Sequence, residues 1–299
     1  MSYMDLHLHS SVSLDGEISP RGLAELCRQE GGRFAALTDH NAVSGTQEFS
    51  WRGAQLGVRV IPGIEIDCMA EDLHVHILGY GIDSANDELV KLEHAVKEMQ
   101  RAASVKQMDA LENLGIFLDR DALMEQAKDG VISAEAMAKQ ALQLPQNRDH
   151  SLLLPFLPGG MRCDQPLVNF YWDLCSHGKK AYVPISFISA KQAIQLIHNA
   201  GGLAVLAHPA MQLQTTENRI EYFLPLELDG LEVFSSYHNA IETAFYLEVA
   251  KKHHLLITGG SDFHGMIKPN IRIGGVDMLY MEDMLAAQLL DALGMTASS

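Results

Sequence analysis

Two short motifs near opposite ends of the chain could bind metal ions. Met4-Asp5-Leu6-His7-Leu8-His9-Ser10 places two imidazoles two residues apart, and Gly260-Ser261-Asp262-Phe263-His264-Gly265 places a carboxylate and an imidazole at the same spacing. Because residues i and i+2 of a strand face the same side, each pair could bind one ion or two adjacent ions. Nearly the whole chain separates the two pairs, so a complete domain must fold between them if they share a site.

Further imidazoles and carboxylates follow segments that have the pattern of short, buried strands. They are His40, Glu65, His76 and His208, so that six of the 14 histidines fall at expected strand ends beside two carboxylates, Glu65 and Asp262. Ligand sites gather at the carboxyl edge of parallel strands. A mixed set of imidazoles and carboxylates without thiolates suits zinc, manganese or iron. The set is larger than one ion can use, which implies two or three ions, and a glutamate such as Glu65 can bridge a pair. His74 shares a strand face with His76 and is expected to support it.

Two parts of the chain alternate short apolar strands with helices. Strands are expected at residues 3–9, 34–38, 58–66, 74–80, 202–207, 231–234 and 255–259, and helices at 22–30, 45–56, 188–199, 241–253 and 281–293. This alternation predicts mainly parallel pairing, and therefore an α/β barrel or a doubly wound sheet. Between these parts, residues 89–114, 119–128 and 133–142 have helical spacing, 144–161 has the composition of a loop, and 169–175 favours a short helix. The sequence thus predicts a helical insertion in an α/β domain.

The composition limits the possible functions. The chain has 299 residues, 47% of them hydrophobic, which suits one large α/β domain or two ordinary ones. It shows neither a membrane span nor a signal peptide, so a cytoplasmic location is expected. The net charge of −16 argues against an extended nucleic-acid surface. A small phosphorylated substrate remains compatible, because bound divalent cations would supply local positive charge. The sequence does not indicate an oligomeric state.

Taken in order, the motifs resemble those of the PHP (polymerase and histidinol phosphatase) metallophosphoesterases. The matching segments are His7-x-His9-Ser10, Leu37-Thr38-Asp39-His40, Pro62-Gly63-Ile64-Glu65, His76-Ile77-Leu78-Gly79-Tyr80, Ala207-His208-Pro209 and Gly260 to Gly265. The resemblance implies a distorted (β/α)7 barrel formed by residues 1–85 and 181–299, with residues 86–180 as a mainly helical, substrate-capping insertion. It also implies a trinuclear metal site at the carboxyl ends of the strands.

The resemblance implies a ligand set for each ion. His7, His9, Glu65 and Asp262 would hold the first ion, and Glu65, His76 and His208 the second. Asp15, His40 and His264 would hold the third, and Asp15 enters only through the resemblance. Glu65, Asp262 and His208 would be the residues most directly involved in catalysis. The expected cofactors are two to three divalent ions of manganese, zinc or iron.

Within the family, the insertion and Gly230-Leu231-Glu232-Val233-Phe234 resemble the branch that hydrolyses nucleoside 3′,5′-bisphosphates and short oligonucleotides. Relatives in that branch carry an Arg-Pro-His run that contacts phosphate, whereas Ser133-Ala134-Glu135 stands here. Ala210-Met211-Gln212 likewise replaces a basic segment after His208-Pro209. The Lys179-Lys180 pair does match a basic position of the branch, so both lysines are expected to contact substrate. His238 is a further candidate for substrate contact or proton transfer.

The predicted reaction is metal-dependent hydrolysis of a phosphate ester on a small nucleotide or sugar phosphate, by attack of a hydroxide that bridges two ions. A cyclic phosphate diesterase would use the same metals and would account for the missing basic run. A 3′-exonuclease shares the barrel, but the net charge counts against it. A non-catalytic metal-binding protein and an amidohydrolase are also considered. An amidohydrolase would favour a lysine at a strand end to bridge its ions, and Glu65 occupies that position here.

Overall fold

The computed structural model describes residues 2–127 and 129–295, with only the backbone at residues 217 and 218. Its described residues divide into two compact units, one from Met1–Glu93 with Phe187–Ser299 and one from His94–Ser186. We call them the barrel unit and the helical unit. Lys128, at the end of the helix predicted over 119–128, and residues 296–299 of the predicted barrel segment lie outside the described residues.

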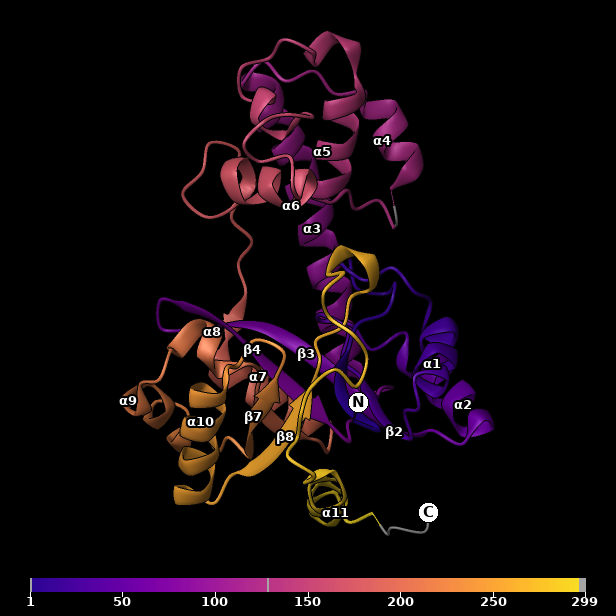
Figure 1. Ribbon diagram of the computed structural model, residues 1–299, viewed down its shortest axis with the longest axis vertical. Helices are drawn as coiled ribbons and strands as arrows, with labels where there is room; N and C mark the ends of the chain where they lie inside the picture. Colours follow the sequence, from indigo (N-terminus) through magenta and orange to yellow (C-terminus); the bar gives the residue numbers. More distant parts are fainter. Residues whose placement is uncertain (1, 128, 296–299) are drawn as a thin grey trace. The chain divides into compact units, whose positions relative to one another are not determined.

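The barrel unit is built on one curved sheet (Figure 1). The strands in chain order are β1 (Met4–Leu8), β2 (Phe34–Leu37), β3 (Arg59–Ala70), β4 (Leu73–Tyr80), β5 (Ile188–Ser189), β6 (Leu203–Leu206), β7 (Gly230–Ser235) and β8 (Leu256–Gly260). Seven of them pair in the order β1-β2-β3-β4-β6-β7-β8. The short strand β5 pairs with the carboxyl-terminal end of β3. The mixed α/β barrel expected from the sequence is confirmed.

The first and last strands of this order meet. Leu8 forms a parallel bridge with Phe263, and the backbone N–H of Asp262 donates to the carbonyl of His7 at 2.9 Å. Gly260 permits this approach, since a Cβ there would lie 2.3 Å from the Cβ of His7. The two metal-binding motifs of the sequence therefore lie side by side at the seam that closes the barrel.

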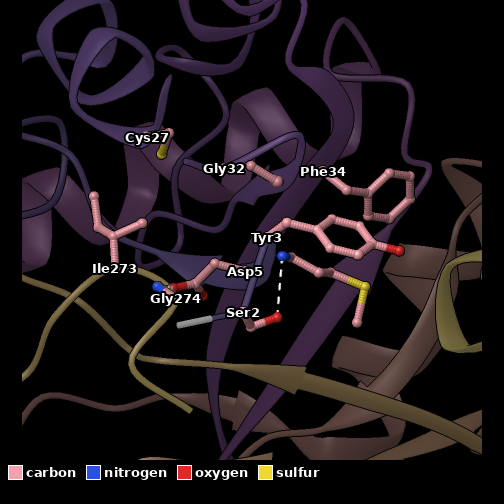
Figure 2. Close-up of a pocket in the computed structure, with 10 residues that line it drawn as sticks. Ser2, Tyr3, Asp5, Cys27, Gly32, Phe34, Ile273 and Gly274 are labelled. Carbon is pink, nitrogen blue, oxygen red and sulfur yellow. Dashed lines mark hydrogen bonds between the residues drawn. The ribbon is translucent and has the colours of Figure 1, made fainter. Parts of the chain in front are cut away.

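A buried carboxylate, Asp5, stabilises the same seam. Its oxygens accept the backbone N–H groups of Ser261 and Gly274, each at 2.8 Å, and burial raises the pKa of the Asp5 carboxyl to about 6. Asp5 also borders a small hollow beside β1 and β2, which Figure 2 shows between Cys27, Phe34 and Gly274. The hollow has room for about one water molecule, so it is not a substrate site.

Strand β4 departs from the expected parallel arrangement. It pairs antiparallel to both β3 and β6. Only two residues separate β3 from β4, which is enough for a hairpin and too few for a crossover helix, and Glu71 in this turn has a φ of 55°. Because β4 runs in the opposite direction, its amino-terminal part, with His76, reaches the edge where the parallel strands end. His76 therefore lies in the amino-terminal half of its strand rather than at the carboxyl end that the sequence predicted.

Helices separate the strands of the barrel unit in sequence, and several of them pack against the sheet. They are α1 (Pro20–Gln29), α2 (Thr46–Leu56), α7 (Ala190–Asn199), α8 (Pro209–Leu213), α9 (Glu217–Glu221), α10 (Ala240–Lys252) and α11 (Glu282–Ala292). Helix α7 packs against β3, β4 and β6, and α10 packs against β7 and β8. Sequence caps explain their starts: Ser189 and Gln192 form a capping box for α7, and Asn239 and Glu242 form one for α10.

The helical unit has its own hydrophobic core. Helix α3 (Asp87–Asn113) begins in the barrel unit and continues into this one, followed by α4 (Arg120–Gln126), α5 (Ala134–Gln143), α6 (Pro166–Phe170) and a π-helical turn (Tyr171–Cys175). Met137, Phe156 and Phe170 are among its buried core residues. Asn147 is buried as well and bonds the backbone of Phe117 and Ala141. Among the residues described, no helix is both long and apolar enough to cross a bilayer.

Candidate metal centre

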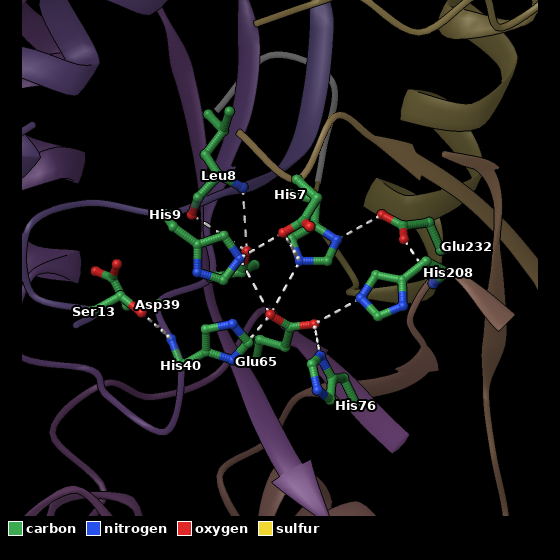
Figure 3. Close-up of polar contacts among 12 residues, drawn as sticks. His7, Leu8, His9, Ser13, Asp39, His40, Glu65, His76, His208 and Glu232 are labelled. Carbon is green, nitrogen blue, oxygen red and sulfur yellow. Dashed lines mark hydrogen bonds and ion pairs between the residues drawn. The ribbon is translucent and has the colours of Figure 1, made fainter. Parts of the chain in front are cut away.

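The fully buried carboxylate of Glu65, in β3, lies at the middle of a group of imidazoles (Figure 3). Five imidazole nitrogens lie 2.9–3.2 Å from its oxygens: His7 Nε2, His9 Nε2 and His40 Nδ1 at Oε2, and His76 Nδ1 and His208 Nε2 at Oε1. The two oxygens therefore face two different sets of histidines. A carboxylate in this arrangement can bridge two neighbouring ions.

A second carboxylate, Asp262, completes the set around His7 and His9. Its Oδ1 lies 3.3 Å from His7 Nε2 and 3.0 Å from His9 Nε2. One potential ligand atom from each of His7, His9, Glu65 and Asp262 lies within 4.8 Å of the others. Asp262 has a φ of 58°, a conformation that non-glycine residues seldom adopt but that aspartate tolerates better than most.

Two further sets of possible ligands adjoin the first. Glu65, His76 and His208 form one, and Asp15, His40 and His264 form the other together with His9. In the latter, Asp15 Oδ2 lies 3.0 Å from His264 Nε2 and 3.5 Å from His40 Nε2. The structure thus brings together all nine residues predicted as ligands: His7, His9, Asp15, His40, Glu65, His76, His208, Asp262 and His264.

The residues present fit divalent ions. Buried polar atoms of proteins are normally hydrogen-bonded, yet several buried atoms here make no hydrogen bond within the described structure. They are His7 Nε2, both ring nitrogens of His9, His40 Nδ1 and Glu65 Oε2. All but one of these atoms, His9 Nδ1, face a carboxylate or imidazole partner across the centre. Ions bound between them would satisfy these atoms, and a donor set of nitrogen and oxygen suits zinc, manganese or iron.

Charges at the centre shift the pKa values of its possible ligands in both directions. Burial alone would raise the pKa of the Glu65 carboxyl, but the imidazoles of His40 and His7 outweigh it and hold this pKa well below its usual range. Burial, reinforced by the neighbouring His264 and His40 rings, lowers the pKa of His9 to about 4. Glu65 is therefore ionised and His9 neutral near pH 7, as metal coordination requires. Burial alone would lower the pKa of the His7 and His76 rings, but nearby carboxylates outweigh it and raise both pKa values well above their usual range, so these two rings must release a proton when metal binds.

Glu232, in β7, supports two of the possible ligands from outside the centre. Its side chain is fully buried; Oε1 accepts from His7 Nδ1 at 2.8 Å, and Oε2 accepts from the backbone N–H of His208 at 2.8 Å. A carboxylate on the outer nitrogen of a histidine fixes the ring orientation and increases its basicity towards a metal. The sequence analysis gave Glu232 no role. The available signal was a single charged residue in an otherwise apolar strand.

Asp67 supports His76 in the way that Glu232 supports His7, and the sequence analysis gave it no role either. Asp67 Oδ1 lies 3.1 Å from His76 Nε2 and 3.3 Å from His74 Nε2, which supports the expected outer position of His74. Asp67 also accepts a hydrogen bond from the amide of Asn41. Its position two residues after Glu65 on one strand places both carboxylates on the same face, which is the signal that could have identified it. Asp67 could alternatively contribute to an ion together with His40 and His76.

The three residues predicted to contact substrate, His238, Lys179 and Lys180, are not part of the ligand sets. Both ring nitrogens of His238 are engaged with the backbone, since Nδ1 lies 2.9 Å from the Val233 carbonyl and Nε2 accepts from the N–H of Ala210 at 3.2 Å. This pattern favours a role in holding the segment after His208. Lys179 and Lys180 are exposed in a turn of the helical unit. Contact of these three residues with substrate stays a prediction.

The segment that departs from the Arg-Pro-His run has a structural role. Ser133 is the N-cap of α5, and its side chain accepts the backbone N–H of Ala136 at 3.2 Å. A serine at this position satisfies one of the free N–H groups at the start of the helix. Ser133 thus has a structural role at the start of α5, whatever else this segment contacts.

Both the sequence and the structure of this chain are similar to those of known proteins. The family model described as PHP domain matches residues 5–142. A phosphoribosyl 1,2-cyclic phosphate 1,2-diphosphodiesterase of Eggerthella lenta is 30% identical over 87% of this chain and 94% of that protein. A 3′,5′-nucleoside bisphosphate phosphatase of Chromobacterium violaceum is 29% identical over 95% of this chain and 93% of that protein.

A solved structure is similar to this chain over nearly its whole length. It is described as an amidohydrolase from Chromobacterium violaceum with bound sulfate and no metal, and it aligns with a TM-score of 0.77 and 26% identity. The alignment covers 96% of this chain and 97% of that one. The similarity therefore spans both units and is not confined to the metal-binding motifs.

Proposed function

Because the chain belongs to the PHP domain family, we propose that it hydrolyses a phosphate ester on a small nucleotide or sugar phosphate with the help of divalent metal ions. The observation that carries this proposal is the grouping of nine potential ligands in adjoining sets, five of them imidazoles directly around the carboxylate of Glu65. A purely structural metal site would need only about four ligands and would leave no reason for a shared carboxylate.

Two to three ions of manganese, zinc or iron would occupy the centre. His7, His9, Glu65 and Asp262 would hold one ion, Glu65, His76 and His208 a second, and Asp15, His40 and His264 a third. Such ions, when bound, would lower the pKa of water towards neutrality and offset the charge of the phosphate oxygens.

The side chains themselves would keep the centre in the required geometry. Glu65 uses each oxygen for a different set of histidines, so it fixes the separation of the two sets. Asp262 closes the first set, and His208, oriented by Gln212 at 3.4 Å, closes the second. Their burial excludes water from the protein side of the centre, which strengthens each electrostatic contact with a bound phosphate.

A cyclic phosphate diester is the second candidate substrate. The Eggerthella lenta relative is named for that reaction. In addition, the Arg-Pro-His run that the family resemblance leads one to expect in a bisphosphate-hydrolysing enzyme is absent from this chain, and Ser133 caps α5 in the corresponding segment. A cyclic diester carries one phosphate with a single charge and would need fewer basic contacts than a bisphosphate does.

The test compares hydrolysis rates of matched substrates by protein loaded with manganese, zinc or iron. A nucleoside monophosphate and a nucleoside 3′,5′-bisphosphate would be assayed for release of inorganic phosphate, a ribose cyclic phosphate for the ring-opened phosphomonoester, and a short oligonucleotide for released nucleotides. We expect turnover of at least one ester, loss of turnover on chelation, and two to three ions per chain by elemental analysis. Glu65→Ala should lose both turnover and bound metal, while Glu248→Ala, on the exposed face of α10, serves as the matched control. Full activity of metal-free protein would contradict the proposal.

A further inference from the structure

Lys268 lies beside the metal centre on the segment that follows β8. Its Nζ is 2.7 Å from Asp262 Oδ2 and 2.8 Å from the hydroxyl of Tyr237. All three residues belong to the barrel unit, so their arrangement does not depend on the helical unit. Neither Lys268 nor Tyr237 was singled out from the sequence, because neither lies in one of the motifs.

Asp262 divides its two oxygens between the centre and this lysine. Oδ1 faces His7 and His9, whereas Oδ2 accepts from Lys268 and from the Tyr237 hydroxyl. The carboxylate is almost fully buried, but the side chain of Lys268 is one-third exposed, at 33%. Lys268 therefore lies where the buried centre meets solvent, which is the side from which a substrate can reach it.

Tyr237 holds the ammonium group of Lys268 near two of the ligand sets, the one with Asp262 and the one with His208. Its ring packs edge-on against His208 with the centroids 5.6 Å apart, and Lys268 Nζ lies 5.5 Å from the centroid of the same ring. Tyr237 thus contacts His208 of one set and Asp262 of another. A phosphate placed across these two sets would come close to the lysine.

The chemistry of the group suits a phosphate oxygen. A lysine ammonium has three N–H donors, and the two recorded contacts use two of them. The third can donate to an additional acceptor. Lysine binds phosphate as a compact positive charge. Carboxylates are dense at this centre, so a cation beside Asp262 also reduces their repulsion of an anionic substrate.

We propose that Lys268 contacts the substrate phosphate, with Tyr237 positioning its ammonium group. This inference rests on the proposed phosphoesterase function and names a residue that binds the substrate. It assigns phosphate binding to the barrel itself, in addition to whatever Lys179 and Lys180 of the helical unit contribute.

The experiment measures phosphate binding and catalysis in Lys268→Met, which keeps an unbranched side chain and removes the charge. Inorganic phosphate is titrated calorimetrically into manganese-loaded protein, and it is also used as a competitive inhibitor of p-nitrophenyl phosphate hydrolysis. We expect the dissociation constant of phosphate and the KM to rise about tenfold, the loss typical of one charge-assisted hydrogen bond. Metal content should stay at the wild-type value. Lys268→Arg should recover part of the affinity, and Tyr237→Phe should weaken binding less than Lys268→Met does.

Lys251→Met is the matched control, because Lys251 is an exposed lysine of the same unit that pairs with Glu248 at 2.9 Å. Unchanged phosphate binding by Lys268→Met would overturn the inference. So would a lower kcat or lower metal content with unchanged phosphate affinity, since Lys268 would then act only by holding Asp262. If wild-type protein binds phosphate but hydrolyses no ester, the proposed function fails, while the calorimetric comparison still tests the lysine.

Discussion

Glu232→Gln gives the sharpest test of how the centre is held together. Glu232 is fully buried and touches two ion sets at once, through the ring of His7 and the backbone of His208. A glutamine has nearly the same shape but offers one acceptor oxygen and one NH2 group. If the oxygen keeps His7, the NH2 group must face the N–H of His208, and two donors then oppose each other.

The expected loss follows from these two hydrogen bonds. Each hydrogen bond to a charged group contributes about 1.5–3 kcal/mol, and the substitution removes at least one of them. Converted to affinity, this loss is about tenfold to one hundredfold, the range usual for partners that orient metal ligands. We therefore expect Glu232→Gln to weaken metal binding by that factor while the fold is retained.

The assay is competition between metal-free protein and a fluorescent chelator for manganese or zinc, with circular dichroism to verify folding. Glu242→Gln is the matched control, since Glu242 lies in the capping box of α10 and glutamine can replace glutamate there. Wild-type metal affinity in Glu232→Gln would refute the role of Glu232 in orienting the ligands. Equal losses in both variants would show that the effect is not local to the centre.

Three further outcomes are expected. Asp67→Asn should weaken binding of the second ion about tenfold, because His76 loses a charged partner, and metal titration should reveal one weakened site with the others unchanged. Asn147→Ala should destabilise the helical unit by about 3 kcal/mol, because it removes three hydrogen bonds of about 1 kcal/mol each. Hydrogen exchange of the backbone amides in α5 should then become faster, while the amides of β6 and β7 stay protected. Unchanged exchange in α5 would contradict this prediction. Removing the metal with a chelator should lower the Tm of the barrel unit, since free ion at one hundred times its Kd contributes about 2.7 kcal/mol per site. The Tm should return on adding manganese, and an unchanged Tm would mean that the ions do not stabilise the fold.

Much of the barrel and of its centre could be predicted, because the relevant signals are local. The alternation of apolar segments with helices indicated the barrel, and its parallel strands placed His7, His40 and His208 at one edge. His76 lies at the same edge for a different reason, because β4 follows a two-residue turn and runs antiparallel to its neighbours. The strand pattern of residues 74–80 was clear, but its direction depends on the turn.

The supporting residues were harder to find because their partners are distant in sequence. Glu232 acts on His7, 225 residues away, and Lys268 reaches Tyr237, 31 residues away. Periodicity identifies which face of a strand a residue occupies, and it does not identify which side chain of another strand lies opposite. A charged residue inside an apolar strand, such as Glu232, is the local sign that such a partner exists.

The closing seam of the barrel and the first set of ligands are made by the same two segments. His7 and Asp262 are joined by a backbone hydrogen bond at 2.9 Å, and their side chains face each other at 3.3 Å. Binding of an ion there and closure of the sheet between β1 and β8 are therefore thermodynamically linked, so each favours the other by the same free energy. Opening of this seam would separate the ligands and would be a route for ion release. We therefore expect the exchange rate of an ion bound there to depend on how often the seam opens, as well as on the metal–ligand bonds.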